Sequence, residues 1–136
     1  EYVALKVIEQ VNGKNKMRKF LKRSLDTYLT QRTFETKREN ALMYNDGQGY
    51  IHYQKGSLIF YALSDYIGEK VLNETLSKYV DKVAFQSPPY TTSIELVDDL
   101  REVIPDSLNY VIKDMFETIT LYENRILKAE SKELNQ

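Results

Sequence analysis

The chain has 136 residues, of which 42% are hydrophobic and 29% are charged, which is enough for one domain with a core. Its 19 basic and 20 acidic residues nearly cancel, so no global field favours nucleic acid or an anionic membrane. The sequence has no cysteine, signal-peptide pattern or apolar run near the ~20 residues of a membrane span, which excludes disulfides, thiolate metal ligands and a transmembrane segment.

The first part of the chain predicts two helices. Residues 2–10 form the first, and Asn12-Gly13 ends it, because glycine is common just past a helix. Residues 14–32 give the clearest amphipathic pattern, with apolar residues at i, i+3, i+4, i+8, i+11 and i+12. The predicted buried stripe of this helix consists of Met17, Phe20, Leu21, Leu25, Tyr28 and Leu29.

Residues 33–49 have no clear period and are predicted to be a loop, of a length that is often functional in compact domains. A central helix over residues 50–68 follows, apolar nearly all round and therefore buried. Tyr53 lies on one face of it beside the very small residues Gly56 and Ser57. A glycine in a helix interior costs about 1 kcal/mol against alanine, and close approach of a backbone or ligand is a common reason for it. The opposite stripe is predicted to be Ile51, Leu58, Ile59, Ala62, Leu63 and Tyr66.

The remaining pattern predicts three more helices. Residues 69–84 form the first of these helices, and a connector that contains Pro88-Pro89 follows it. Thr92 and Glu95 make a capping box that starts the second helix. Pro105 separates this helix from the last one. The period then alternates from about residue 120, which is a weak strand signal. We therefore predict a compact all-α array of about six helices over residues 1–119, and read 120–136 as the first strand of a missing downstream β domain.

The charged groups favour ordinary structural roles. His52 is the single histidine, and without cysteine it cannot build a zinc site, which needs about three protein ligands, so we assign this chain no metal ligand. A basic run could contact phosphates or anionic lipid, but a solvated helix face is favoured because aromatic interleaving and net basic charge are both missing. This run consists of Lys14, Lys16, Arg18, Lys19, Lys22 and Arg23.

The string YIHYQKGSLIFYALSDYIGE resembles the Tyr-x-Lys-Gly helix of the gluzincin zinc aminopeptidases, the aminopeptidase N family, and the segment from Leu63 to Glu69 matches the one that follows it. The later stretch YVDKVAFQSPPYTTSIELVDDL is similar to a stretch of the same family. The best match is a bacterial subgroup fused to membrane permease-like segments. The likeness runs from residue 1 to about residue 129, in the same order along the chain.

The resemblance implies a parent enzyme that hydrolyses peptide bonds with zinc. Glu1-Tyr2 matches the end of the pattern after the family's ligand glutamate, so we expect the zinc helices to lie upstream, outside this chain. The implied partners are a peptide substrate, those zinc helices and a downstream β domain of the same chain, with no nucleic acid. We expect the fragment to be soluble and inactive alone, and its parent to be bacterial and membrane-associated.

In family terms, Tyr53 is the catalytic tyrosine that donates a hydrogen bond to the tetrahedral oxyanion beside the metal. Lys55, Gly56 and Ser57 are the implied support of the substrate cleft. Gln54 departs from the glutamate that many members have, and Gln48 stands where some members add a second tyrosine. Two alternatives stay open: a non-catalytic interaction module or peptidase homologue that has lost zinc, and a binder of nucleic acid or anionic lipid through the basic run.

Overall fold

A computed structural model describes residues 1–120 and 127–130, and all its regular structure is helical. The predicted all-α class is therefore confirmed for the described part of the chain. The predicted strand over residues 120–136 falls mainly outside the described residues. Of that stretch, Thr120 and residues 127–130 are described, and they belong to no helix or strand.

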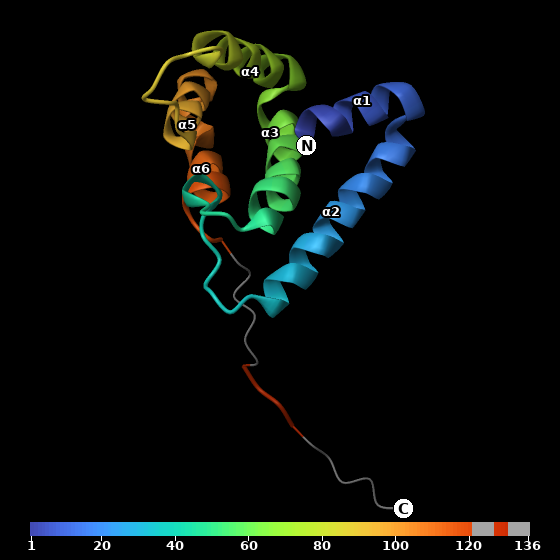
Figure 1. Cartoon of the computed structure of the whole chain (residues 1–136). Helices are drawn as coiled ribbons and strands as arrows, with labels where there is room; N and C mark the ends of the chain where they lie inside the picture. The colour runs from blue at the N-terminus through green and yellow to red at the C-terminus, as the bar shows by residue number, and fades with distance from the viewer. Residues whose placement is uncertain (121–126, 131–136) are drawn as a thin grey trace, which may run out of the picture.

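Within the described residues, six α-helices and four short helical turns follow one another, and α3 occupies the middle of the molecule (Figure 1). An arm of two helices, α1 (Tyr2–Asn12) and α2 (Lys14–Phe34), lies on one side of α3 (Gly56–Ile67). On the other side lie α5 and α6, and α4 leads from one end of α3 across to α5. The bounds of these helices are α4 (Glu69–Val83), α5 (Ser93–Val103) and α6 (Asn109–Ile112).

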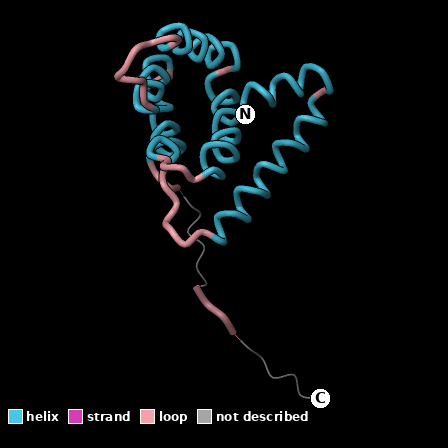
Figure 2. The backbone as a smooth tube through the Cα atoms, viewed as in Figure 1, coloured by secondary structure: helices cyan, strands magenta, loops and turns pink. Residues whose placement is uncertain are grey.

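Two glycines end helices where the sequence predicts it. Gly13 has φ 84° between α1 and α2, and Gly68 has φ 87° between α3 and α4. Both lie in the region that L side chains rarely adopt, so glycine ends these helices at low conformational cost. Longer loops join α2 to the central helix and α4 to α5 (Figure 2). The first of them contains a 3-10 turn, η1 (Leu42–Tyr44).

The main core lies between α3, α4, α5 and the last helical stretch. It is completed by Tyr2 from α1 and Met43 from η1, so both the N-terminal helix and the first loop are anchored in it. Burial of such apolar side chains is the main favourable term in folding. The cluster comprises Tyr2, Met43, Ile59, Leu63, Leu72, Val97, Leu100, Ile104, Val111, Ile112 and Phe116.

The predicted stripe of α2 is only partly buried. Met17 is fully buried, but Phe20, Leu25 and Leu29 are each more than 40% exposed. The prediction assumed that the whole apolar face packs on the core. The arm instead contacts α3 and the turn before it through only part of this apolar face. The side chains at the edges of the face therefore remain exposed to solvent. Tyr66 of the predicted stripe on α3 is likewise half exposed.

The predicted capping box is incomplete. Thr92 does occupy the N-cap of α5, but its side chain makes no capping hydrogen bond. The hydroxyl of Thr91 donates instead to the carboxylate of Glu95. Beyond Pro105 the final helical stretch combines three geometries, with a 3-10 turn η3 (Asp106–Leu108), α6 and a π-turn η4 (Lys113–Glu117).

Within the described residues, no helix has both the length and the apolar character that crossing a bilayer requires.

Candidate functional site

The predicted central helix begins with a π-helical turn, η2 (Tyr50–Lys55), which runs directly into α3. π-turns are rare and frequently occur at functional sites. The wider turn also changes which side chains face inward, because a projection at 3.6 residues per turn does not apply to it. Tyr50 and Ile51 are consequently both buried, at 3% and 0% exposure.

Tyr53 lies in this turn and is not a core residue. Its side chain is 53% exposed, and its ring packs against that of His52 with 4.2 Å between the centroids. No hydrogen bond joins the Tyr53 hydroxyl to any other described residue. The phenol is therefore held by its ring on one side while its donor is available to an external acceptor.

The ring of His52 is held in one tautomer by a short chain of hydrogen bonds. The backbone N–H of Gln48 donates to Oδ1 of Asn45 at 3.2 Å, which fixes the orientation of the Asn45 amide. Its Nδ2 then lies 2.8 Å from Nδ1 of His52, and an amide nitrogen can only donate. Nδ1 must accept, so the neutral ring carries its proton on Nε2.

A groove of about 390 Å³ runs beside this turn, lined by residues of α1, η1, α3, α4, α5 and η4. His52, Gly56, Ser57 and Phe60 lie along it, whereas Tyr53 is not among its lining residues. The hydroxyl of Ser57 is buried and donates back to the carbonyl of Gln54 at 2.8 Å, so it offers no donor to the groove. Of the proposed cleft residues, the structure thus brings Gly56 and Ser57 to the groove.

The expectation that close approach requires Gly56 is not supported within this chain. A Cβ at this position would lie 3.6 Å from the carbonyl oxygen of Ile51 and 3.8 Å from a methyl group of Leu42. Both are ordinary van der Waals distances, and the backbone of Gly56 is right-handed helical. Nothing among the described residues therefore forbids alanine here.

Lys55 turns away from the groove into a buried ion pair. Its ammonium lies 2.5 Å from the carboxylate of Glu39, whose side chain is 3% exposed. The same carboxylate pairs with Arg32 of α2 and accepts a hydrogen bond from the Tyr28 hydroxyl at 2.9 Å. We call Tyr28, Arg32, Glu39 and Lys55 the Glu39 cluster. It ties α2 and the first loop to the π-turn that carries Tyr53.

Burial raises the pKa of the Tyr28 phenol well above its usual range, and the hydrogen bond to Glu39 raises it further. Tyr50 stacks on Tyr28 with 5.9 Å between ring centroids. Its own pKa is raised by burial and then by the nearby carboxylates of Glu35 and Glu39. Although Glu35 lies close, the Tyr50 hydroxyl forms no hydrogen bond of ordinary length with any described residue. Together with Tyr50, the cluster thus gathers two cationic side chains and two tyrosine rings around one buried carboxylate.

The side chains that the structure describes do not bring together the ligands of a zinc site. The described part contains no group of three His, Cys, Asp or Glu side chains that could hold a metal ion. His52 has Nδ1 engaged by Asn45 and a proton on Nε2, so in this arrangement it offers no free lone pair.

The Glu39 cluster was not found by sequence reasoning. Glu39 lies in the aperiodic loop, and its contacts with Lys55, Arg32 and Tyr28 bridge separate elements. One signal was present, because Lys55 lies within a predicted helix that is apolar nearly all round, and a buried lysine needs a counter-charge.

Comparisons of the chain with protein-family models, with curated proteins and with solved structures find no match.

Proposed function

We propose that this chain is the helical part of the catalytic domain of a gluzincin-type zinc aminopeptidase that hydrolyses peptide bonds. Support comes from the ordered sequence pattern around the Tyr-Gln-Lys-Gly motif. The structural observation that carries the proposal is the presentation of Tyr53. It stands half exposed on a π-turn, with no described hydrogen-bond partner for its hydroxyl, next to an apolar groove.

Tyr53 would act as an electrostatic catalyst. Peptide hydrolysis passes through a tetrahedral species whose oxygen carries developing negative charge, and a positioned donor stabilises that charge more than it stabilises the substrate carbonyl. The Tyr53 hydroxyl is such a donor, and its contact with the His52 ring limits the positions it can adopt. No second tyrosine joins it, because the corresponding position is Gln48.

Gly56 and Ser57 would form one wall of the substrate cleft, through the groove that they line. Lys55 would act indirectly, by fixing the π-turn to Glu39 rather than by contacting a peptide. As the resemblance implies, the zinc ligands would lie in a different part of a longer parent chain. This chain alone is then expected to be inactive, and the parent to be bacterial and membrane-associated.

The test is a peptidase assay of the parent protein with its metal controlled. We expect aminopeptide substrates to be cleaved, activity to disappear on chelation, and zinc to restore it, because the metal supplies Lewis-acid chemistry that no residue here replaces. A parent that lacks a zinc-binding motif and cleaves no peptide would establish the alternative, a non-catalytic helical module.

A further inference from the structure

The first half of α2 carries an uneven share of the positive charge. Residues 14–23 contain six basic residues and no acidic one, which leaves 13 basic and 20 acidic residues for the rest of the chain. The near-zero net charge therefore hides a strong separation of charge. A local field of this kind attracts an anionic partner even when the whole molecule is close to neutral.

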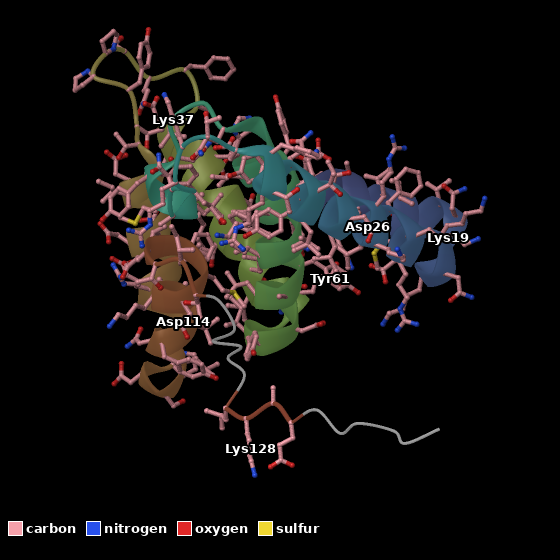
Figure 3. The ribbon with its side chains drawn as sticks, turned by 90° about the horizontal axis from the view of Figure 1, so that it is seen from below. Lys19, Asp26, Lys37, Tyr61, Asp114 and Lys128 are labelled. Carbon is pink, nitrogen blue, oxygen red and sulfur yellow. The ribbon has the colours of Figure 1, made fainter. Side chains whose placement is uncertain are left out.

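These six side chains are exposed and almost unengaged. Among the described residues, only Lys22 has an ion pair, with Asp26 one helical turn later on the same helix. Figure 3 shows Lys19 at the far end of the arm, well away from the α5 and α6 side of the molecule. The charge thus lies on a part of the surface that the rest of the fold leaves open.

Exposed apolar side chains accompany the charges. Phe20 is 46% exposed, Leu25 41% and Leu29 49%. Arg18, Lys22, Leu25 and Leu29 follow one another at i, i+4, i+7 and i+11, so they share one face of the helix. This face is cationic in its first half and apolar in its second.

The shape of α2 suits a flat partner. Its 21 residues form a single helix at one edge of the molecule, with a length of about 31 Å at 1.5 Å per residue. Helices that lie on membranes combine basic residues with Phe and Leu in this way, and anionic lipid headgroups attract the lysines and arginines.

We propose that the exposed side of α2 binds an anionic lipid surface. The apolar residues favour lipid over nucleic acid. They can enter the boundary between headgroups and acyl chains, whereas a phosphate backbone offers them no apolar contact. Single-stranded nucleic acid is usually held on several stacked aromatic rings, and residues 14–23 contain only Phe20. This proposal does not rest on the peptidase function.

Vesicle sedimentation with the chain as it exists tests the proposal. We expect it to bind phosphatidylcholine vesicles that contain phosphatidylserine, and not vesicles of phosphatidylcholine alone. Binding should weaken strongly as salt rises, because the Debye length falls from about 10 Å at 0.1 M to about 3 Å at 1 M. Absence of binding to phosphatidylserine vesicles at low salt, in the folded chain, would overturn the proposal.

A pair of matched triple variants locates the surface. The first variant combines Lys14→Gln, Arg18→Gln and Lys22→Gln, which lie on the same face of α2 as Leu25 and Leu29, and should bind roughly tenfold to a hundredfold more weakly. The control removes three exposed lysines elsewhere, Lys70→Gln, Lys78→Gln and Lys113→Gln, and should keep most of its binding. Both variants lower the charge equally, so equal losses would show a net-charge effect and contradict a site on α2. Circular dichroism checks that both variants are folded.

Fluorescence separates lipid contact from simple adsorption. The chain has no tryptophan, so Leu25→Trp supplies a single reporter on the proposed face of α2, and Phe85→Trp, at a fully exposed position, supplies a control. A blue shift with phosphatidylserine vesicles for the first reporter and none for the second supports the proposal. Binding to an oligonucleotide at the same salt, with no blue shift on vesicles, would instead identify a nucleic-acid surface and overturn it.

Discussion

The ammonium of Lys55 and the carboxylate of Glu39 meet at 2.5 Å with side-chain exposures of only 13% and 3%. This buried pair joins the π-turn η2 to the first loop, and Arg32 extends the contact to α2. Breaking a buried ion pair by removing one partner leaves an uncompensated charge that water cannot solvate well. The position of the Tyr53 turn therefore depends on a carboxylate that lies 14 residues earlier in the chain.

Glu39→Gln should lower the free energy of unfolding by about 3 kcal/mol, since it leaves Lys55 and Arg32 without their counter-charge. Urea unfolding followed by circular dichroism measures this. The control is Asp26→Asn, which breaks the exposed pair with Lys22 and should cost under about 1 kcal/mol. Equal, small effects of the two substitutions would show that the cluster does not hold the turn. Should Glu39→Gln fail to fold, Lys55→Met is the milder variant, because Arg32 and Tyr28 still engage Glu39.

Gly56→Ala should stabilise this chain by about 0.5–1 kcal/mol, because alanine is the better helix former and its Cβ meets only ordinary contacts here. The same denaturation experiment measures the change. A loss of stability would mean that the backbone around Gly56 is tighter than the distances to Ile51 and Leu42 indicate. If activity of the parent falls while this chain is stabilised, the glycine is needed for a partner outside the chain.

Stability should fall at alkaline pH, in part because of Tyr28. Its pKa is raised in the folded state by burial and by Glu39, so the folded protein holds a proton that the unfolded chain loses near pH 10. The stabilisation is complete below the unfolded pKa of about 10 and is lost as pH rises toward and through the higher folded pKa. Urea unfolding at several pH values measures the slope. Tyr28→Phe should flatten it, and Tyr44→Phe, at an exposed position, should not; the reverse pattern would contradict the assignment.

His52 should carry its proton on Nε2 when neutral. Long-range proton–nitrogen NMR of the ring distinguishes the two tautomers directly. Asn45→Ala should bring both tautomers into exchange, because it removes the donor to Nδ1. Observation of a proton on Nδ1 in the unsubstituted chain would mean that the chain from Gln48 through Asn45 to His52 is not formed.

The sequence predicted the helical class and the helix ends at Gly13 and Gly68, because a glycine that ends a helix and the periodicity of a helix are both local signals. It did not predict the π-turn, since a pattern read at 3.6 residues per turn assumes the geometry that the turn departs from. The exposed flanks at Phe20 and Leu25 were also missed. Periodicity shows which face of a helix is apolar, but only the packing of the arm determines how much of that face is covered.

The candidate site was predicted in part. Tyr53 stands out by its place beside Gly56 and Ser57, and the structure puts it on an exposed turn near the groove that those two residues line. Lys55 forms a buried ion pair with Glu39 and does not line the groove. The sequence did not indicate this pair, because Glu39 lies in a loop that has no periodic pattern. Long-range charge pairing of this kind depends on tertiary structure and leaves no spacing in the sequence.

The most direct test of the proposed function is peptidase kinetics of the parent enzyme with Tyr53→Phe, with zinc content measured in both proteins. The substitution removes one hydrogen-bond donor and little volume, and Tyr66→Phe, half exposed on α3, is the matched control. If the donor meets the oxyanion only in the transition state, kcat should fall by roughly 10²–10³ with little change in KM, while the control keeps normal turnover. Near-normal kcat in a Tyr53→Phe enzyme with full zinc content would contradict the catalytic role of Tyr53.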